Sequence, residues 1–195
     1  MQRIARKTGK SLPKPPDEAA LREAALAHLA RFAATEAGLA RVLSRRIDRW
    51  ARAAGEVGLA PEIIDSALRA AREAVPRVVA AMRGAGAVDD AAFAESRARR
   101  LIRQGKSRRA ALAHLAGKGV DAALAARLLP ADPASDLAAA CAYLRRRRLP
   151  PFGPGGRDRA LASLARGGFS RDVAERALDL EQAQAEALVE GLRRG

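Results

Sequence analysis

The stretch LAHLAGKGVDAALAARLL, residues 112–129, decides the fold, because LASLARGGFSRDVAERAL at residues 161–178 repeats its pattern 49 residues later. Each stretch predicts a helix with a leucine stripe, a glycine turn that carries one apolar residue, and a second helix. Self-similarity at such a period is typical of a repeat protein, in which each unit buries its apolar face against a neighbour. The matched positions are Leu112, Leu115, Gly119, Val120 and Leu129 in the first stretch and Leu161, Leu164, Gly168, Phe169 and Leu178 in the second.

The composition favours helices throughout. Hydrophobic residues make up 49% of the sequence, but aromatic residues make up only 3%, and alanine supplies much of the apolar content. Such a composition suits closely approaching helices with a thin core, and the scarcity of β-branched and aromatic residues argues against a sheet. We therefore expect an all-α protein of about three tandem three-helix repeats. Its functional surface should be extended, in place of an enclosed active-site pocket.

Helix-ending signals divide the chain into five segments. Pro76 falls inside a helical pattern, and we expect a kink or a break there because proline lacks the N–H of an intrahelical bond. Gly105 should end one helix, while Gly119 and Gly168 should hold left-handed turns. The segments are a flexible basic tail at 1–17, three-helix repeats at 18–84, 85–131 and 132–182, and a polar helical extension at 183–195.

The charge balance favours a polyanionic partner. Lysine and arginine total 36 and aspartate and glutamate 22, which gives a formal net charge of +14. Nucleic acid, an acidic protein surface or an anionic membrane would each suit this excess, although genomic base bias also enriches arginine. The single cysteine, Cys141, fits a reducing cytosol, and neither a secretory signal nor a membrane-spanning run is apparent. We expect a soluble cytoplasmic protein without a membrane partner.

The helix expected at 90–104 is the most informative segment for function. Its arginines lie opposite an alanine stripe, and no acidic residue interrupts the basic residues between 97 and 109. The alternative is a solvated face with arginines at a helix end, as the helix dipole favours. Like charges in this number repel unless a polyanion meets them, so we interpret them as a binding surface. The contact candidates are Arg97, Arg99, Arg100, Arg103, Lys106, Arg108, Arg109 and, after the next helix, Lys118.

A second basic cluster stands at the end of another expected helix. It consists of Arg145, Arg146, Arg147 and Arg148, next to a proline- and glycine-rich loop. Adjacent residues on a helix point in different directions, so two or three of these side chains could reach one phosphate or carboxylate. Complementing the helix dipole and keeping the protein soluble would account for the cluster equally well.

Catalytic chemistry finds little support in the sequence. His28 and His114 lie on different expected helices without a ligand-spaced partner, and Cys141 has the spacing of a core residue. Asp89 and Asp90 stand at a helix start, where capping explains them better than a pair of catalytic carboxylates. We therefore expect no enzyme activity, no cofactor and no metal site.

Aromatic residues are too few to bind bases by stacking. Trp50 and Tyr143 are the only tryptophan and tyrosine, which argues against a single-strand-binding platform. Phe93 lies off the alanine stripe of its helix, and we expect it to pack against an adjacent unit.

An ordered set of motifs resembles the RecX family of bacterial regulatory proteins. The acidic pair Asp89-Asp90 precedes Phe93-Ala94, a basic helix ends at Gly105, and Leu112, Leu115 and Lys118-Gly119 follow. Leu161, Leu164 and Gly168-Phe169 resemble the last repeat of the same family, and 25–50 is similar to its first unit. The likeness covers about residues 20–180 and is strongest over 86–129.

The resemblance implies both an architecture and a function. RecX proteins are tandem three-helix repeats that form an elongated, curved, solenoid-like array. They lie in the groove of the RecA recombinase filament on DNA and restrain its ATP hydrolysis, strand exchange and co-protease activity. The resemblance thus implies a non-enzymatic, cytoplasmic modulator of homologous recombination, DNA repair and the SOS response. Its partners would be the RecA filament and single- and double-stranded DNA without sequence preference, and we expect a monomer.

Three other functions stay open. A RecA-independent, nucleoid-associated DNA-binding protein would show affinity for bare DNA that falls steeply with salt. A helical nuclease or hydrolase would need a cluster of carboxylates or histidines in a pocket. A scaffold for an unrelated acidic protein would need only the basic surface.

Overall fold

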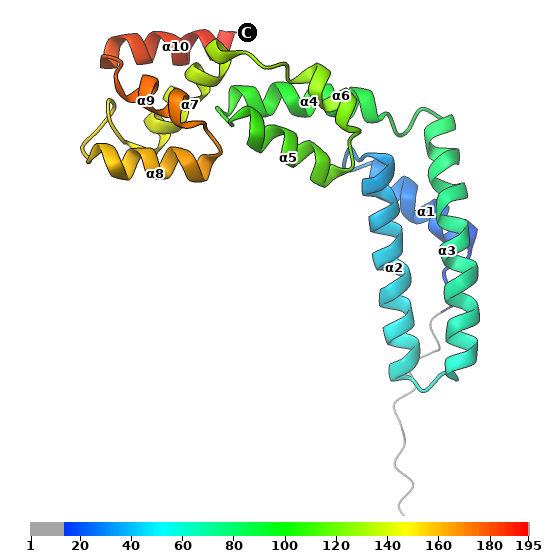
Figure 1. Cartoon of the computed structure of the whole chain (residues 1–195). Coiled ribbons are helices and arrows are strands. Elements are labelled where there is room, and N and C mark those ends of the chain that lie inside the picture. The colour runs from blue at the N-terminus through cyan, green and yellow to red at the C-terminus, as the bar shows by residue number, and fades with distance from the viewer. Residues whose placement is uncertain (1–13, 195) are drawn as a thin grey trace, which may run out of the picture. The chain divides into compact units, whose positions relative to one another are not determined.

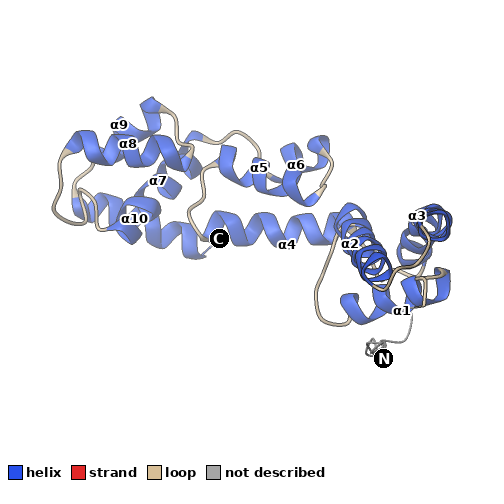
Figure 2. Cartoon of the chain, turned by 90° about the horizontal axis from the view of Figure 1, so that it is seen from below, coloured by secondary structure: helices blue, strands red, loops and turns tan. Residues whose placement is uncertain are grey.

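A computed structural model describes residues 14–194, and within that range every regular element is a helix (Figures 1 and 2). The predicted all-α fold is therefore confirmed. The helices are α1 (Glu18–Leu29), α2 (Glu36–Glu56), α3 (Pro61–Gly84), α4 (Asp90–Arg103), α5 (Arg108–Lys118), α6 (Ala122–Leu128), α7 (Pro133–Arg147), α8 (Arg157–Gly167), α9 (Arg171–Leu178) and α10 (Gln182–Arg194). The tail predicted at 1–17 lies outside the described residues up to position 13.

The chain folds as two compact units that divide between Asp89 and Asp90. The first unit contains α1–α3. Its long helices α2 and α3 run side by side, and α1 packs against α3 (Figure 1). The side chains of Leu39, Leu43 and Val78 have no solvent exposure and form the centre of its core.

Helix α3 passes through Pro76 without a break, so the break considered from the sequence is wrong. Pro76 is exposed, whereas Val75, Val78 and Val79 beside it are buried in the core of the first unit. Proline removes one backbone donor, and the packing of the valines on both sides of it holds the rest of the helix together.

The second unit has two apolar clusters. One lies among α4, α5 and α6, around Ala98, Leu101 and Leu115. The other lies among α7 to α10, around Leu144 and Leu164. Each cluster is rich in alanine, which lets the helices approach closely, as the composition predicted.

Two glycine turns match in the second unit, as the sequence repeat predicted. Gly119 after α5 has φ 87° and ψ 18°, and Gly168 after α8 has φ 87° and ψ 16°. The N–H of the next residue bonds back to a leucine carbonyl in both turns, at 3.1 Å: Val120 to Leu115 and Phe169 to Leu164. Both positions are left-handed, a conformation that glycine adopts without the penalty of a Cβ.

Helix α10 is part of the core of the second unit, although its sequence reads as a polar extension. Ala185 and Val189 are buried and pack with the α7–α9 helices. Polar residues occupy the opposite face, so the Gln- and Glu-rich composition hides an amphipathic helix.

Candidate nucleic-acid interface

Helix α4 separates an apolar face from a cationic one. Ala94, Ala98 and Leu101 are buried against α5 and α6. Arginines occupy the solvent side because the helical period of 3.6 residues places them away from this stripe. We call the exposed residues Arg99, Arg100, Arg103 and Lys106 the α4 basic surface.

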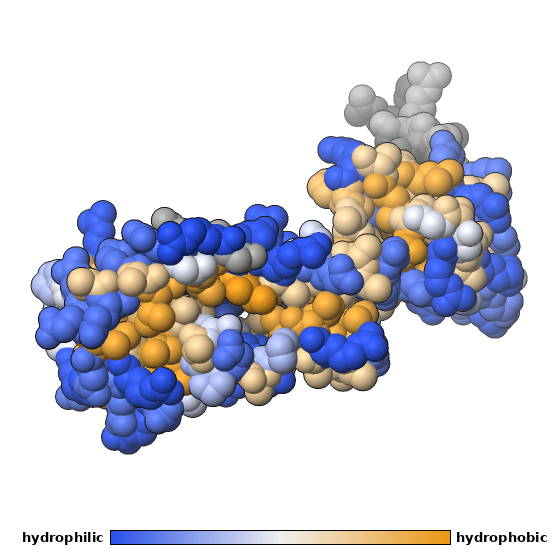
Figure 3. Space-filling view, turned by 90° about the horizontal axis from the view of Figure 1, so that it is seen from above, coloured by the Kyte–Doolittle hydropathy of each residue, from blue (hydrophilic) through white to orange (hydrophobic). Residues whose placement is uncertain are grey.

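The charges of the α4 basic surface are hardly compensated. The Arg99 guanidinium is 4.0 Å from the Glu95 carboxylate, and both side chains are more than half exposed, so this pair contributes little. Among the described residues, no carboxylate lies within 4 Å of the cationic groups of Arg100, Arg103 or Lys106. In Figure 3, hydrophilic side chains line the edge of the second unit that α4 and α10 form. The cations of the α4 basic surface are therefore exposed and can attract an anionic partner.

Arg97 turns inward and has a structural role. Its Nε–H donates to Nε2 of His114 on α5 at 2.9 Å, which joins the two helices. Partial burial lowers the pKa of His114, and the positive charges of Arg97, Lys118 and Lys106 lower it further. The neutral imidazole thus serves as an acceptor beside several cations, and Arg97 is not part of the exposed surface.

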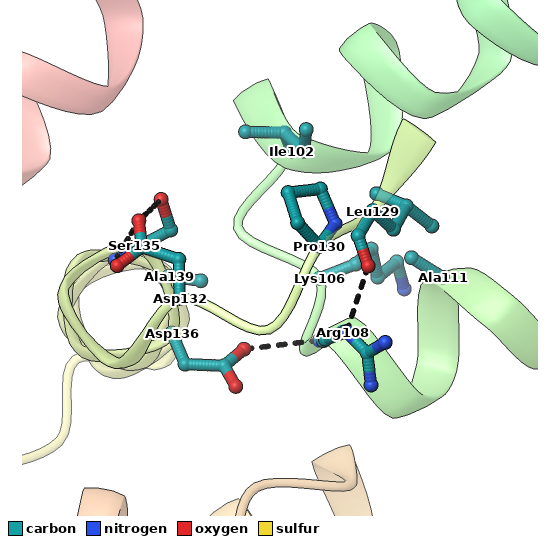
Figure 4. A pocket seen from close by; sticks show the side chains of 10 residues that line it. All are labelled: Ile102, Lys106, Arg108, Ala111, Leu129, Pro130, Asp132, Ser135, Asp136 and Ala139. Atoms are coloured by element: carbon teal, nitrogen blue, oxygen red, sulfur yellow. Dashed lines mark hydrogen bonds between the residues drawn. The ribbon is translucent and has the colours of Figure 1, made fainter. Parts of the chain in front are cut away.

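Arg108 is likewise held by the fold. Its Nε–H donates to the carbonyl oxygen of Leu129 at 2.7 Å, and its backbone N–H donates to Oδ1 of Asp136 at 3.1 Å (Figure 4). These bonds tie the start of α5 to the end of α6 and to α7. Arg108 therefore positions helices, and its predicted role as a contact residue has weaker support than that of its neighbours.

A pocket of about 160 Å³ lies beside Arg108 (Figure 4). Its carboxylates already have partners in the chain. Asp132 accepts from the Ser135 hydroxyl and from the backbone N–H groups of Ala134 and Ser135, which together lower the pKa of Asp132. These bonds cap α7, so the pocket has the character of a helix junction.

The four arginines at the end of α7 have three kinds of environment. Arg145 pairs with Glu186 of α10 at 2.8 Å. The guanidinium carbons of Arg146 and Arg147 lie 6.0 and 4.6 Å from the centroid of the Tyr143 ring. Arg148 caps the helix in the left-handed region, with φ 52°.

The turn between α4 and α5 packs tightly against the α7–α8 helices, a contact that the sequence did not reveal. A Cβ on Gly105 would lie 2.6 Å from Cβ of Ala142, and Gly105 has φ 61°. The Ser107 hydroxyl donates to the Gly167 carbonyl oxygen at 2.8 Å. The glycine pattern is visible in the sequence, but its partners lie dozens of residues away, where no local pattern indicates them.

The comparisons with known proteins decide the family. The chain is 35% identical over 181 residues to "Regulatory protein RecX" of Myxococcus xanthus (strain DK1622), across 88% of this chain and 90% of that protein. This chain belongs to the RecX family. Residues 89–129 match the family description "RecX, second three-helix domain", which spans α4–α6 and the whole α4 basic surface. No solved structure matches the chain.

Several other residues of this RecX-family chain lie at the start of α4 or against the apolar clusters of the second unit. Asp90 is the first residue of α4 and Asp89 directly precedes it. Leu112 and Leu161 are half-buried against the cores of their clusters. Phe93 is half-buried against the α4–α6 core, so the apolar contact expected from an adjacent unit is provided by its own helices.

Cys141 and His28 of this RecX-family chain both pack against neighbouring side chains of the fold. Cys141 is buried, and burial raises the pKa of its thiol to about 11, so its thiolate is not populated at neutral pH. His28 lies against the Phe32 ring. Across residues 14–194, His, Cys, Asp and Glu side chains do not gather in the threes that a metal ion needs, and no helix has the length and apolar character to span a bilayer. Trp50 and Tyr143 are both 7% exposed, which leaves neither ring available to bases.

Proposed function

We propose that this chain regulates the RecA recombinase by binding the RecA–DNA filament through the α4 basic surface. The observation that carries the proposal is the placement of exposed, largely unpaired cations on α4, within the segment that matches the second three-helix domain of RecX. A relative at 35% identity carries the name "Regulatory protein RecX". A filament of protein-coated DNA is the kind of polyanion that would relieve the repulsion among these arginines.

In this proposal the chain acts by occupying the groove of the filament and catalyses no reaction itself. Repeats that bind successive RecA protomers combine weak contacts into a higher overall affinity. Each bound repeat raises the effective concentration of the next repeat at its own site. Three-helix units with the boundaries 18–84, 85–131 and 132–182 would supply those contacts. Occupancy of the filament groove would restrain ATP hydrolysis, strand exchange and co-protease activity, and so limit recombination and the SOS response. We propose that the protein does this in the cytoplasm as a monomer, with no cofactor.

The experiment that tests this proposal compares the filament with bare DNA. Fluorescently labelled protein is titrated with preformed RecA filaments on single-stranded DNA, and separately with the same DNA without RecA, at low and at moderate salt. We expect clearly tighter binding to the filament, with a preference that survives the higher salt, because protein contacts are screened less than phosphate contacts. Equal affinity for filament and bare DNA at both salts would overturn the proposal.

A second candidate function is RecA-independent binding to DNA, as in a nucleoid-associated protein. The net charge of +14 and the arginines at the end of α7 favour it, because both would attract any phosphate backbone. It predicts that saturation of bare DNA and any effect on RecA occur at the same protein concentration and disappear together as salt rises.

A further inference from the structure

The contact between the α4–α5 turn and the α7–α8 helices brings arginines from two parts of the chain to one glycine turn. A Cβ on Gly168 would lie 3.2 Å from Nε of Arg109, so that guanidinium group rests against the turn. A Cβ on the preceding Gly167 would lie 2.9 Å from Cε2 of Tyr143. The guanidinium of Arg147 in turn stands over the Tyr143 ring. Gly167 and Gly168 therefore connect Arg109 to the arginines of α7.

Tyr143 is fixed in position. Its hydroxyl donates to the Ser163 carbonyl oxygen at 2.8 Å, and its ring meets the Phe169 ring edge-on, with centroids 5.5 Å apart. The ring is buried and cannot move to follow the arginines, so Arg146 and Arg147 are ordered by it. A guanidinium that lies over an aromatic face keeps its in-plane N–H donors, which are the groups that grip phosphate.

Arg148 adds a fourth cation, at a backbone position that the neighbouring loop holds closely. The chain returns over it closely, because a Cβ on Gly153 would lie 2.5 Å from the Arg148 carbonyl oxygen. The side chain of Arg148 is exposed, in a left-handed conformation that glycine adopts more easily. This backbone conformation fixes where the Arg148 side chain leaves the chain.

We propose that Arg109, Arg146, Arg147 and Arg148 form a phosphodiester-binding strip, with Tyr143 as the residue that positions it. None of the four has a carboxylate within 4 Å among the described residues, whereas Arg145 beside them is neutralised by Glu186. The strip shares no residue with the α4 basic surface, so it stands or falls independently of the proposed action on RecA.

The surroundings of the strip favour nucleic acid over an acidic protein segment. Protein segments dock on apolar anchors, whereas a phosphate backbone needs only cations and donors. The large apolar side chains that are exposed in the described residues, Leu26, Phe32 and Ile63, all belong to α1–α3 and the loop between α1 and α2. The strip thus presents guanidinium groups to a partner and, among the described residues, has no large exposed apolar side chain beside them.

The test is the binding of the full chain to fluorescein-labelled oligothymidylate, without RecA, across a series of NaCl concentrations. Fluorescence anisotropy gives the dissociation constant at each salt. We expect Arg146→Gln with Arg147→Gln to weaken binding about tenfold at low salt. The slope of log affinity against log salt should fall by about 1.4, because each phosphate contact on a single strand contributes about 0.7. Arg109→Gln should lower the slope by about 0.7. The matched control is Arg49→Gln with Arg52→Gln, which removes two exposed arginines from α2.

Two further variants separate positioning from charge. Arg147→Lys keeps the charge but lacks the planar group that lies over Tyr143, so we expect several-fold weaker binding with an unchanged salt slope. Tyr143→Phe keeps the ring and should bind within about twofold of the natural chain, whereas Tyr143→Leu removes the ring and should match Arg147→Lys. Circular dichroism checks that each variant is folded, and Arg147→Lys tests the positioning role even if Tyr143→Leu fails to fold.

Either of two results would overturn the proposal. The first is an equal loss of affinity in the Arg146/Arg147 variant and in the Arg49/Arg52 control, which would mean that only total charge matters. The second is an unchanged affinity of the Arg146/Arg147 variant for oligothymidylate together with lost affinity for polyglutamate, which would assign the strip to an acidic protein partner.

Discussion

The Ser107 hydroxyl donates a 2.8 Å hydrogen bond to the Gly167 carbonyl oxygen, across 60 positions of sequence. The Ser107 hydroxyl oxygen also accepts the backbone N–H of Ala110 at 3.2 Å and so caps α5. The buried Ser107 side chain thereby provides a hydrogen-bond partner for a backbone N–H at the start of α5 and for a backbone carbonyl at the end of α8. The α4–α6 and α7–α10 helices of the second unit are held together by this bond as well as by the close approach of Gly105 to Ala142.

Ser107→Ala should lower the free energy of unfolding by more than the loss of a helix cap alone would. We expect a fall of about 2 kcal/mol in the free energy of unfolding, since both the cap and the partner of the partly buried Gly167 carbonyl are lost. The matched control is Ser170→Ala, because Ser170 caps α9 in the same way, from the Val173 N–H at 3.3 Å. It should cost about 1 kcal/mol. Urea unfolding measures both, and equal losses would contradict a linking role for Ser107.

Gly105→Ala should be among the most damaging small substitutions in the second unit. The added methyl group meets Ala142 at 2.6 Å and must also adopt φ 61°. We expect a loss of about 2–4 kcal/mol, from overpacking together with left-handed strain. Gly119→Ala, at an exposed left-handed position, should lose about 1 kcal/mol from strain alone. Similar losses in the two variants, measured by thermal or urea unfolding, would remove the packing role of Gly105.

These two glycines show how far the sequence could be interpreted. The sequence predicted that Gly105 ends a helix and that Gly119 holds a left-handed turn, because helix ends are governed by local rules. The same kind of local rule explains the caps at Thr35, Ser107 and Asp121, whose side-chain oxygens accept backbone N–H groups three residues later. Nothing local predicted that Gly105 meets Ala142, since that contact depends on how two sets of helices pack.

The candidate surface was predictable to a similar degree. The helical period separated the exposed arginines of α4 from its alanine stripe. It could not separate Arg97 and Arg108 from the others, because their partners, His114 and the Leu129 carbonyl, lie on other helices. Charge patterns show where cations gather, while only the packing shows which of them are already used.

Arg148→Gly should raise the stability of the chain and weaken its binding to nucleic acid. Relief of the left-handed strain is worth about 1–2 kcal/mol, and the added freedom of glycine in the unfolded chain cancels roughly half of it. We expect the free energy of unfolding to rise by about 0.5–1 kcal/mol. Binding to oligothymidylate should weaken at the same time. A less stable variant, or one that binds as tightly as the natural chain, would contradict the account of Arg148.

The stability of the second unit should depend on pH through His114. The pKa of His114 lies below its ordinary value of 6.5 in the folded protein, so the unfolded chain takes up the proton first as the pH falls. The stabilisation of the folded state by neutral His114 is complete above pH 6.5. It is lost as the pH falls toward the pKa that His114 has in the folded protein. His114→Gln keeps an acceptor for Arg97 but cannot titrate. The stability advantage of the natural chain over this variant should therefore shrink between about pH 7.5 and about pH 5.5 in urea unfolding. Parallel pH profiles would show that His114 does not contribute.

Regulation of RecA through α4 is best tested by the DNA-dependent ATPase activity of RecA, measured while the natural chain or its Arg99→Glu, Arg100→Glu, Arg103→Glu variant is titrated in. Circular dichroism first confirms that the variant is folded. We expect the natural chain to inhibit ATP hydrolysis at concentrations too low to coat the DNA, and we expect the variant to need at least about tenfold more protein. Inhibition by both proteins at the same concentration, or by neither, would contradict a regulator that acts on RecA through α4.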